Sequence, residues 1–439
     1  MLPKNKLLAL LLLIVVVLIP LPAAAADTDV HYGALNGTVI TPPTPGRHPA
    51  VVLVAGAGPT QRDAYRAEAE AFARAGIVTL IYDKRAGYSR ATTSFSDLAD
   101  DALAGVRMLR ARPDVDPERV GLWGHSQGGW VVPLAATRSS DVKFVVVVAA
   151  GGHRPDRSQL WSNRVYLEHA GVESRLIRPI GENLSRMMID AGLFGDTEND
   201  PVAVLERVDQ PVLGVWGALD RSVVPGESLT IYQRALDRGR HAGYSLRVVP
   251  GADHSLRSTP DGFVDEGTFA PGYLEMVTSW ITGARTPTID AAPAQPVASQ
   301  PVRALSWYEN PALHLVALGL MLVAFLAFPV GAVVRRIRGR KSSGWAPRLC
   351  VAAGLAAVLG TAAYVFSIVV TGSTAIGGVV LGRPVPWLIL QLLAVGVVAA
   401  GIATAVSWPR AGSKARLVAP LIGTAVFLPW AFYWGLFTL

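Results

Sequence analysis

Two hydrophobic patterns divide the chain. Between residues 27 and 283, short apolar runs rich in β-branched residues alternate with amphipathic stretches of helical period; the runs are 51–54, 78–82, 120–123, 144–148, 212–216 and 245–249. Nearly continuous apolarity over so few residues is typical of strands buried on both faces of a parallel sheet. The intervening patterns predict helices over 64–75, 97–111 with Ser96 as N-cap, and 127–137. This alternation predicts a doubly wound, mostly parallel α/β domain.

One long segment interrupts the alternation. Residues 153–209 are mostly of helical pattern and separate two predicted strands, so we interpret them as a lid inserted into the α/β domain. Its apolar residues, among them Trp161, Met187 and Met188, are suited either to the lid's own core, which is the simpler interpretation, or to the wall of an acyl pocket.

The pattern changes after a linker rich in proline and alanine at 284–311. Four apolar stretches follow, at about 312–334, 349–371, 387–407 and 417–437, and each has roughly the 20 residues needed to cross a bilayer. Basic residues gather in the first and third loops, whereas the second loop holds only Arg383. The positive-inside rule therefore predicts that the first and third loops are cytoplasmic and that the α/β domain lies outside the cytoplasm.

The amino terminus supports the same orientation. Lys4 and Lys6 precede an apolar run at 7–21, and four alanines at 23–26 come before Asp27. This order is typical of a secretory signal peptide, here residues 1–26 with cleavage after Ala26. An uncleaved signal anchor is the alternative, and it too places the following domain outside.

Composition and charge narrow the classes of function. A hydrophobic fraction of 51% against 17% charged residues excludes a disordered chain. The net charge of +7 is made of −5 in residues 27–283, +2 in 1–26 and +10 in 284–439. The basic residues thus flank membrane segments, and nucleic-acid binding loses its support. The single cysteine, Cys350, lies in an apolar run, so the sequence predicts neither disulfides nor a cysteine-ligated metal.

The candidate chemistry begins at a Gly-x-Ser-x-Gly sequence, Gly124–Gly128, with Ser126 at its centre. It stands between a predicted strand and a predicted helix, which is the context that a nucleophile elbow requires. Glycines suit the flanking positions because side chains there would clash in so tight a turn. The bland alternative is a glycine-rich turn in which Ser126 only caps the helix.

A serine nucleophile needs a base and a carboxylate that orients the base. Asp220 and His254 each follow the carboxyl end of a predicted strand, in the chain order serine, acid, histidine. Asp253 is the nearest rival acid, but as the direct neighbour of His254 it is badly placed to reach that ring. His125, inside the elbow, is expected to pack rather than react.

Acyl transfer also needs two donors for the developing oxyanion. The backbone N–H of Gln127, directly after the serine, is the first candidate. The loop after the first predicted strand supplies the second, for which we choose the N–H of Ala57, with Gly58 as the alternative. This chemistry requires no cofactor and no metal.

Four stretches, 51–59, 82–89, 124–129 and 251–254, resemble α/β-hydrolases of the bacterial esterase, dienelactone hydrolase and serine aminopeptidase type. The resemblance extends over about 33–283 and implies the α/β-hydrolase fold and the triad named above. The sequence departs from the family at Ala55, where many members carry histidine, and at Ala86, where glycine is usual. The four apolar stretches resemble no family that we can assign.

These features together predict a membrane-anchored, extracytoplasmic serine hydrolase of carboxylic esters or thioesters, acting on a small or lipid-like acyl substrate. A serine peptidase of the same fold is one alternative, and a non-catalytic membrane receptor or binding module is another. The interiors of the four stretches hold no charged residue or histidine, which favours an anchor over a transporter. The oligomeric state stays open.

Overall fold

The computed structural model describes residues 26–195, 199–239, 243–295, 297–337, 344–411 and 414–438. The predicted signal segment, apart from Ala26, lies outside the described residues. The described residues form two compact units: a sheet unit within Met1–His153, Asn199–Asp220 and Pro225–Ala294, and a membrane-helix unit within Arg154–Glu198, Arg221–Val224 and Gln295–Leu439. Each unit is described by itself below.

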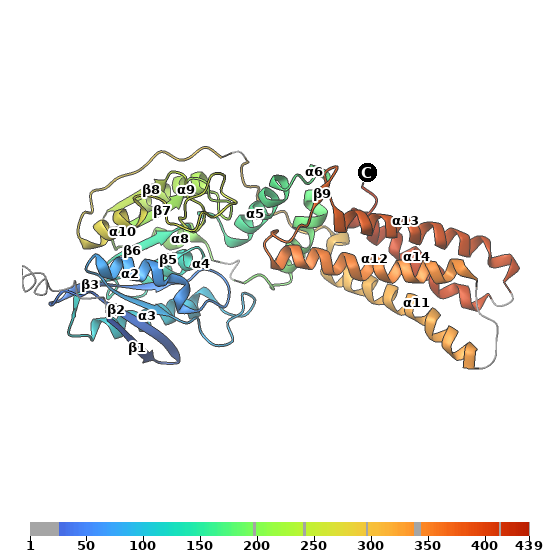
Figure 1. Ribbon diagram of the computed structural model, residues 1–439, viewed down its shortest axis with the longest axis horizontal. Coiled ribbons are helices and arrows are strands. Elements are labelled where there is room, and N and C mark those ends of the chain that lie inside the picture. Colours follow the sequence, from blue (N-terminus) through green and yellow to red (C-terminus); the bar gives the residue numbers. More distant parts are fainter. Residues whose placement is uncertain are drawn as a thin grey trace, which may run out of the picture. The chain divides into compact units, whose positions relative to one another are not determined.

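The sheet unit is built on eight strands in the order β1-β2-β4-β3-β5-β6-β7-β8 (Figure 1). The strands are β1 (Ala26–Tyr32), β2 (Leu35–Thr41), β3 (His48–Val54), β4 (Val78–Tyr82), β5 (Val115–His125), β6 (Val145–Val148), β7 (Val212–Gly217) and β8 (Tyr244–Val249). The six strands from β3 to β8 run parallel, and β1 and β2 form an antiparallel hairpin that pairs antiparallel with β4. The predicted mostly parallel α/β fold is confirmed, and all six predicted strands are present. The hairpin was not predicted.

Helices cover both faces of this sheet. One face packs on α2 (Arg66–Arg74) and α10 (Tyr273–Thr282), and Val51, Leu53 and Phe72 share that core. The opposite face carries α3 (Phe95–Arg110), α4 (Gln127–Ala136), α8 (Pro201–Leu205) and α9 (Pro225–Arg238). Successive strand residues point to opposite faces, so Val52 meets α3, where a Cβ on Gly105 would come 3.1 Å from its side chain.

Two helix starts differ from the prediction. The N-cap of α3 is Ser94 rather than Ser96: the Ser94 hydroxyl accepts from the Asp97 N–H at 3.0 Å, and the Asp97 carboxylate accepts from the Ser94 N–H at 3.0 Å. This reciprocal capping box satisfies two backbone donors, whereas Ser96 lies inside the first turn. The pattern over 64–75 is divided between a 3-10 turn, η1 (Arg62–Tyr65), and α2.

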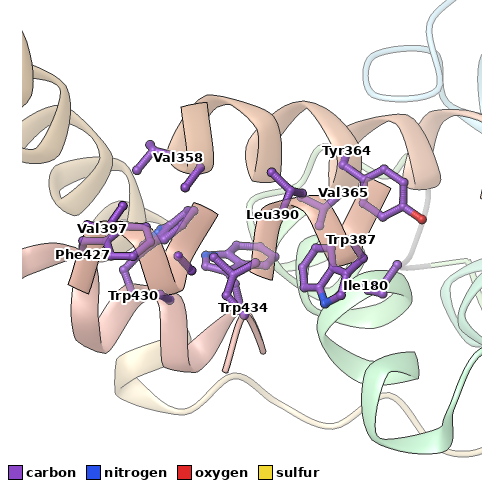
Figure 2. Close-up of a cluster of buried hydrophobic side chains, with 14 of the residues drawn as sticks. Ile180, Val358, Tyr364, Val365, Trp387, Leu390, Val397, Phe427, Trp430 and Trp434 are labelled. Carbon is purple, nitrogen blue, oxygen red and sulfur yellow. The ribbon is translucent and has the colours of Figure 1, made fainter. Parts of the chain in front are cut away.

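The membrane-helix unit contains four helices that are long and apolar enough to cross a membrane: α11 (Pro311–Ile337), α12 (Trp345–Val370), α13 (Val385–Val406) and α14 (Ala415–Tyr433). Their apolar side chains enclose a core that includes Trp387 and Phe427 (Figure 2). Short elements precede and join them: η3 (Trp307–Glu309), the hairpin β9 (Val379–Val380) and β10 (Arg383–Pro384), and η4 (Trp408–Arg410).

Most of the segment predicted as a lid belongs to this second unit. It forms α5 (Pro155–His169), α6 (Ser174–Ile177), the π-helical turn η2 (Arg178–Glu182) and α7 (Asn183–Asp190). Ile180 of η2 shares one hydrophobic cluster with Trp387 of α13 and Tyr364 of α12, as Figure 2 shows. These short helices and the four long ones therefore have a common core.

A buried carboxylate links the same helices to the start of α11. Glu309 is fully buried, and its carboxylate accepts hydrogen bonds from Arg186 at 2.9 Å and Arg178 at 2.7 Å. Burial alone would raise the pKa of Glu309, but these guanidinium groups and the Ser306 N–H hold it well below its usual range. A charged carboxylate is thus stable here because its charge is paired.

Candidate active site

The turn at Ser126 is strained and depends on its glycines. Strand β5 ends at His125 and α4 begins at Gln127, so Ser126 makes the whole connection, with φ 53° and ψ −114°. A Cβ on Gly124 would come 2.3 Å from the Gly128 carbonyl oxygen, and one on Gly128 would come 2.1 Å from that of Val54. Only glycine fits at either position. Positive φ at a non-glycine residue is costly and is characteristic of a functional site.

Ser126, His254 and Asp220 form one hydrogen-bonded chain. His254 Nε2 lies 2.9 Å from Ser126 Oγ, and His254 Nδ1 lies 2.8 Å from Asp220 Oδ2. Asp220 is fully buried, whereas the His254 side chain keeps about a fifth of its surface exposed. With Nδ1–H donating to the carboxylate, Nε2 is free to accept the serine proton.

The acid and the histidine meet because their loops leave neighbouring parallel strands. β7 and β8 pair along their length, and beyond them the Leu219 N–H donates to the Ala252 carbonyl at 2.9 Å. A Cβ on Gly217 would lie 2.2 Å from the Asp253 carbonyl oxygen, so glycine permits this close approach. Asp253 itself accepts from the backbone N–H groups of Ser255 and Arg257 and thereby shapes the turn that carries His254.

The surroundings of His254 suit a general base. Burial by itself would lower its pKa, but the charge and hydrogen bond of Asp220 outweigh burial and raise the pKa above its usual value. A raised pKa means a stronger proton acceptor, which helps to deprotonate a serine hydroxyl near neutral pH.

The two backbone groups predicted as oxyanion donors belong to the residue after the serine and to a loop that approaches it from β3. The Gln127 N–H opens α4, so it has no partner within the helix and stands at the positive end of the helix dipole. The loop of Ala57 approaches from β3: a Cβ on Gly56 would lie 3.4 Å from Ser126 Cβ. Within the described part of the chain, no group accepts a hydrogen bond from the Ala57 N–H.

Behind the serine, His125 connects three loops. Its Nδ1 lies 3.0 Å from the Tyr65 hydroxyl and its Nε2 lies 3.0 Å from the His254 carbonyl oxygen. The Tyr65 hydroxyl in turn accepts from the Gly56 N–H at 2.9 Å. Burial, together with the nearby His254 ring, lowers the pKa of His125 to about 4, so the ring is neutral and can donate at Nε2 while accepting at Nδ1. Sequence reasoning assigned His125 to packing and gave Tyr65 no role, because neither contact is local in sequence.

The unusual alanine at position 86 fits its turn. The left-handed residue there is Gly87, with φ 74°, whereas Ala86 is not among the described residues with positive φ. An alanine methyl group is therefore tolerated at this position without backbone strain.

Comparison with known proteins supports the fold. Residues 51–266 match the Alpha/beta hydrolase family. Esterase EstD of Thermotoga maritima is 27% identical over 283 residues, which cover 58% of this chain and 67% of the esterase. Thiohydrolase apmlB of Arthrinium phaeospermum is 32% identical over 105 residues, but this match spans only 23% of the chain and 34% of the thiohydrolase.

The solved structures to which this chain is similar are more distant in sequence. DcsB in complex with its substrate analogue is 20% identical with a TM-score of 0.42, covering 58% of this chain and 98% of that one. Dienelactone hydrolase from Anabaena variabilis is 19% identical with a TM-score of 0.37, covering 59% and 95%.

Proposed function

We propose, starting from the membership of residues 51–266 in the Alpha/beta hydrolase family, that this protein is a membrane-anchored serine hydrolase of carboxylic esters or thioesters. The observation that carries the proposal is the hydrogen-bonded chain from Ser126 through His254 to Asp220 at a strained strand-to-helix turn. A cap or packing role would require neither the strain at Ser126 nor a fully buried carboxylate on the far nitrogen of His254.

The proposed reaction has two steps. Ser126 Oγ attacks the carbonyl carbon of the substrate while His254 Nε2 takes the serine proton, and the imidazolium is stabilised by Asp220. The carbonyl oxygen, now negatively charged, receives hydrogen bonds from the Gln127 and Ala57 N–H groups. His254 then protonates the leaving alcohol or thiol, and water, deprotonated by the same ring, releases the acid and restores Ser126.

Esters and thioesters fit this site most simply because their leaving groups need the least help. Two relatives are named an esterase and a thiohydrolase, which supports the same class. The expected substrate is a small-molecule or lipid-like acyl compound. Comparing turnover of acyl esters with that of aminoacyl amides separates this function from a peptidase of the same fold.

The four long helices support anchoring in a membrane, and we place the sheet unit on the extracytoplasmic side because of the charge bias of the loops. In a Cys350→Ala background, a membrane-impermeant maleimide should label Ser139→Cys in intact spheroplasts but label Lys414→Cys only after lysis. The reverse pattern would invert the topology and leave the proposed chemistry untouched.

A fluorophosphonate probe tests the activated serine. Full-length protein in membranes should be labelled, Ser126→Ala should lose labelling entirely, and His254→Ala should lose most of it. Ser139→Ala is the matched control, because Ser139 Oγ only accepts from the Asp141 N–H in a surface turn, and it should label like the parent. A folded parent without labelling would instead favour the non-catalytic binding module.

A further inference from the structure

Lys84 joins the two sides of the proposed oxyanion site. It is the second residue after β4, in a stretch that marked the family resemblance, and the reaction described above gives it no role. Its Nζ donates to the carbonyl oxygen of Gly56 and, at 2.8 Å, to the side-chain Oε1 of Gln127. One side-chain nitrogen therefore contacts Gln127, whose own N–H is one proposed oxyanion donor. It also contacts Gly56, whose carbonyl shares a peptide with the other proposed donor, the N–H of Ala57.

We propose that Lys84 is a positioning residue for the oxyanion site, which fixes the Gly56–Ala57 peptide and the first residue of α4 so that both N–H donors face the reacting carbonyl. This inference rests on the proposed function. It deepens that function by assigning a lysine that does not touch the substrate's carbonyl but controls the groups that do.

Peptide geometry is the first argument. The Gly56 carbonyl and the Ala57 N–H belong to one trans peptide, in which these two groups point in opposite directions. Holding the carbonyl oxygen at Lys84 thus fixes the direction of the Ala57 N–H. A peptide flip would turn the N–H away and place a carbonyl oxygen, which repels an oxyanion, in its position.

The loop needs such a restraint because its own backbone is permissive. Gly56 and Gly58 flank Ala57, and Gly58 has φ 105°, so few steric barriers hold the intervening peptides. The peptide before Gly56 is held separately, since the Gly56 N–H donates to the Tyr65 hydroxyl at 2.9 Å. Lys84 supplies the matching restraint on the peptide after Gly56.

The other side of the site is restrained in the same way. Gln127 is buried, and its Oε1 accepts from Lys84 and, at 2.9 Å, from the Tyr88 hydroxyl. The Tyr88 ring also lies against the ammonium group, with Nζ 4.1 Å from the ring centroid. The side chain of Gln127 is therefore locked, and its backbone N–H is held with it.

The residues beside Lys84 hold the lysine itself in place. Asp83 accepts from the Arg62 N–H at 3.0 Å, and Arg85 makes a two-pronged contact with Asp101 of α3 at 2.8 Å. The backbone on both sides of Lys84 is thus anchored to separate elements. A side chain mounted on so rigid a base is suited to setting the geometry of others.

The charge of Lys84 has no acidic partner: within the described residues no carboxylate lies within ion-pair distance of its Nζ. Burial, and secondarily the charge of Arg90, lowers the pKa of Lys84 to about 7. In its protonated form, the ammonium against the Gly56 carbonyl polarises that peptide and favours a negative charge on its N–H side, and the neutral amine still has two N–H donors for the same two acceptors.

The test uses full-length protein in detergent micelles with p-nitrophenyl butyrate as substrate and an alkyl trifluoromethyl ketone as transition-state analogue. Lys84→Met should lower kcat by about 10²-fold, the cost of displacing one oxyanion donor, with KM changed less than about threefold. Affinity for the ketone, which forms an oxyanion when bound, should fall in parallel with kcat. Lys84→Arg, which keeps charge and donors, should recover part of both losses.

Lys143→Met is the matched control, because Lys143 pairs with Glu118 at 2.8 Å away from the site, and it should behave like the parent. Parent-like kcat in Lys84→Met, or a lower kcat with unchanged ketone affinity, would overturn the inference alone. Retained hydrolysis in Ser126→Ala, measured beside it, would overturn the proposed function and the inference together. If circular dichroism shows that Lys84→Met does not fold, Gln127→Met decides by the same readouts.

Discussion

Replacing Asp220 by asparagine tests the proposed mechanism most directly. The carboxylate lies 2.8 Å from His254 Nδ1 and is fully buried, so the charge that forms on His254 during attack is stabilised at short range. Two unit charges at that separation attract by about 6 kcal/mol at an effective dielectric constant of about 20. The same exchange in a serine protease triad lowers kcat by about 10⁴-fold, which is ~5.5 kcal/mol. We therefore expect Asp220→Asn to lose about 10⁴-fold in kcat.

The pH dependence gives the second, independent readout. In the parent, activity should fall as the pH drops through the raised pKa of His254, because a protonated ring cannot accept the serine proton. Without the carboxylate, burial is left as the main influence, and burial lowers a histidine pKa. The acid limb of the kcat/KM profile of Asp220→Asn should therefore move to lower pH.

The assay is hydrolysis of p-nitrophenyl butyrate between pH 5 and 9, with folding checked by circular dichroism. Asp253→Asn is the matched control: it removes the charge of the neighbouring acid while its remaining carbonyl oxygen can still accept from Ser255 and Arg257. It should keep activity within a few-fold of the parent. A folded Asp220→Asn with parent-like kcat, or with an unmoved acid limb, would refute the assignment of Asp220.

Three further changes test the surroundings. Gly128→Ala should abolish folded protein in the membrane fraction of expression trials, because its Cβ would lie 2.1 Å from the Val54 carbonyl oxygen; a folded, fluorophosphonate-reactive variant would contradict the steric argument. Tyr65→Phe removes the hydroxyl shared by Gly56 and His125 and should lower kcat about tenfold with little change in KM; unchanged kcat would show that this network does not position the site. Glu309→Ala leaves Arg186, of which 4% is exposed, as a buried unpaired charge and should destabilise the membrane-helix unit by about 3–5 kcal/mol; thermal unfolding in detergent should detect it, and Tm within 1 °C of the parent, on the order of experimental error, would contradict it.

The sheet was largely predictable because its central strands are buried on both faces. Runs such as 144–148 and 212–216 are short and almost wholly apolar, which is typical of strands buried on both faces of a parallel sheet. The pattern therefore predicts both that these strands form and that they run parallel. The amino-terminal hairpin could not be found in this way. β1 is exposed along most of its length, and an exposed edge strand carries no continuous apolar signal.

The candidate triad was also accessible from sequence, because each member stands at a strand end and the fold fixes the chain order. The choice between Asp220 and Asp253 followed from distance along the chain, and the structure brings Asp220 to the ring of His254. By contrast, the contacts of Lys84 and His125 join residues 28 to 129 positions apart. No local pattern encodes such contacts, and only the arrangement of three loops around the elbow makes them visible.

The insertion illustrates a different limit of sequence reasoning. Its apolar residues were compatible with a lid core or with an acyl pocket, and periodicity could not say what they pack against. In the structure, Leu167, Ile177, Ile180 and Met187 share one hydrophobic cluster with the long apolar helices, and Arg186 adds a buried ion pair to Glu309 just before α11. Breaking that assembly would expose apolar surface and an arginine charge together. The inserted helices are therefore expected to unfold with the membrane helices rather than separately.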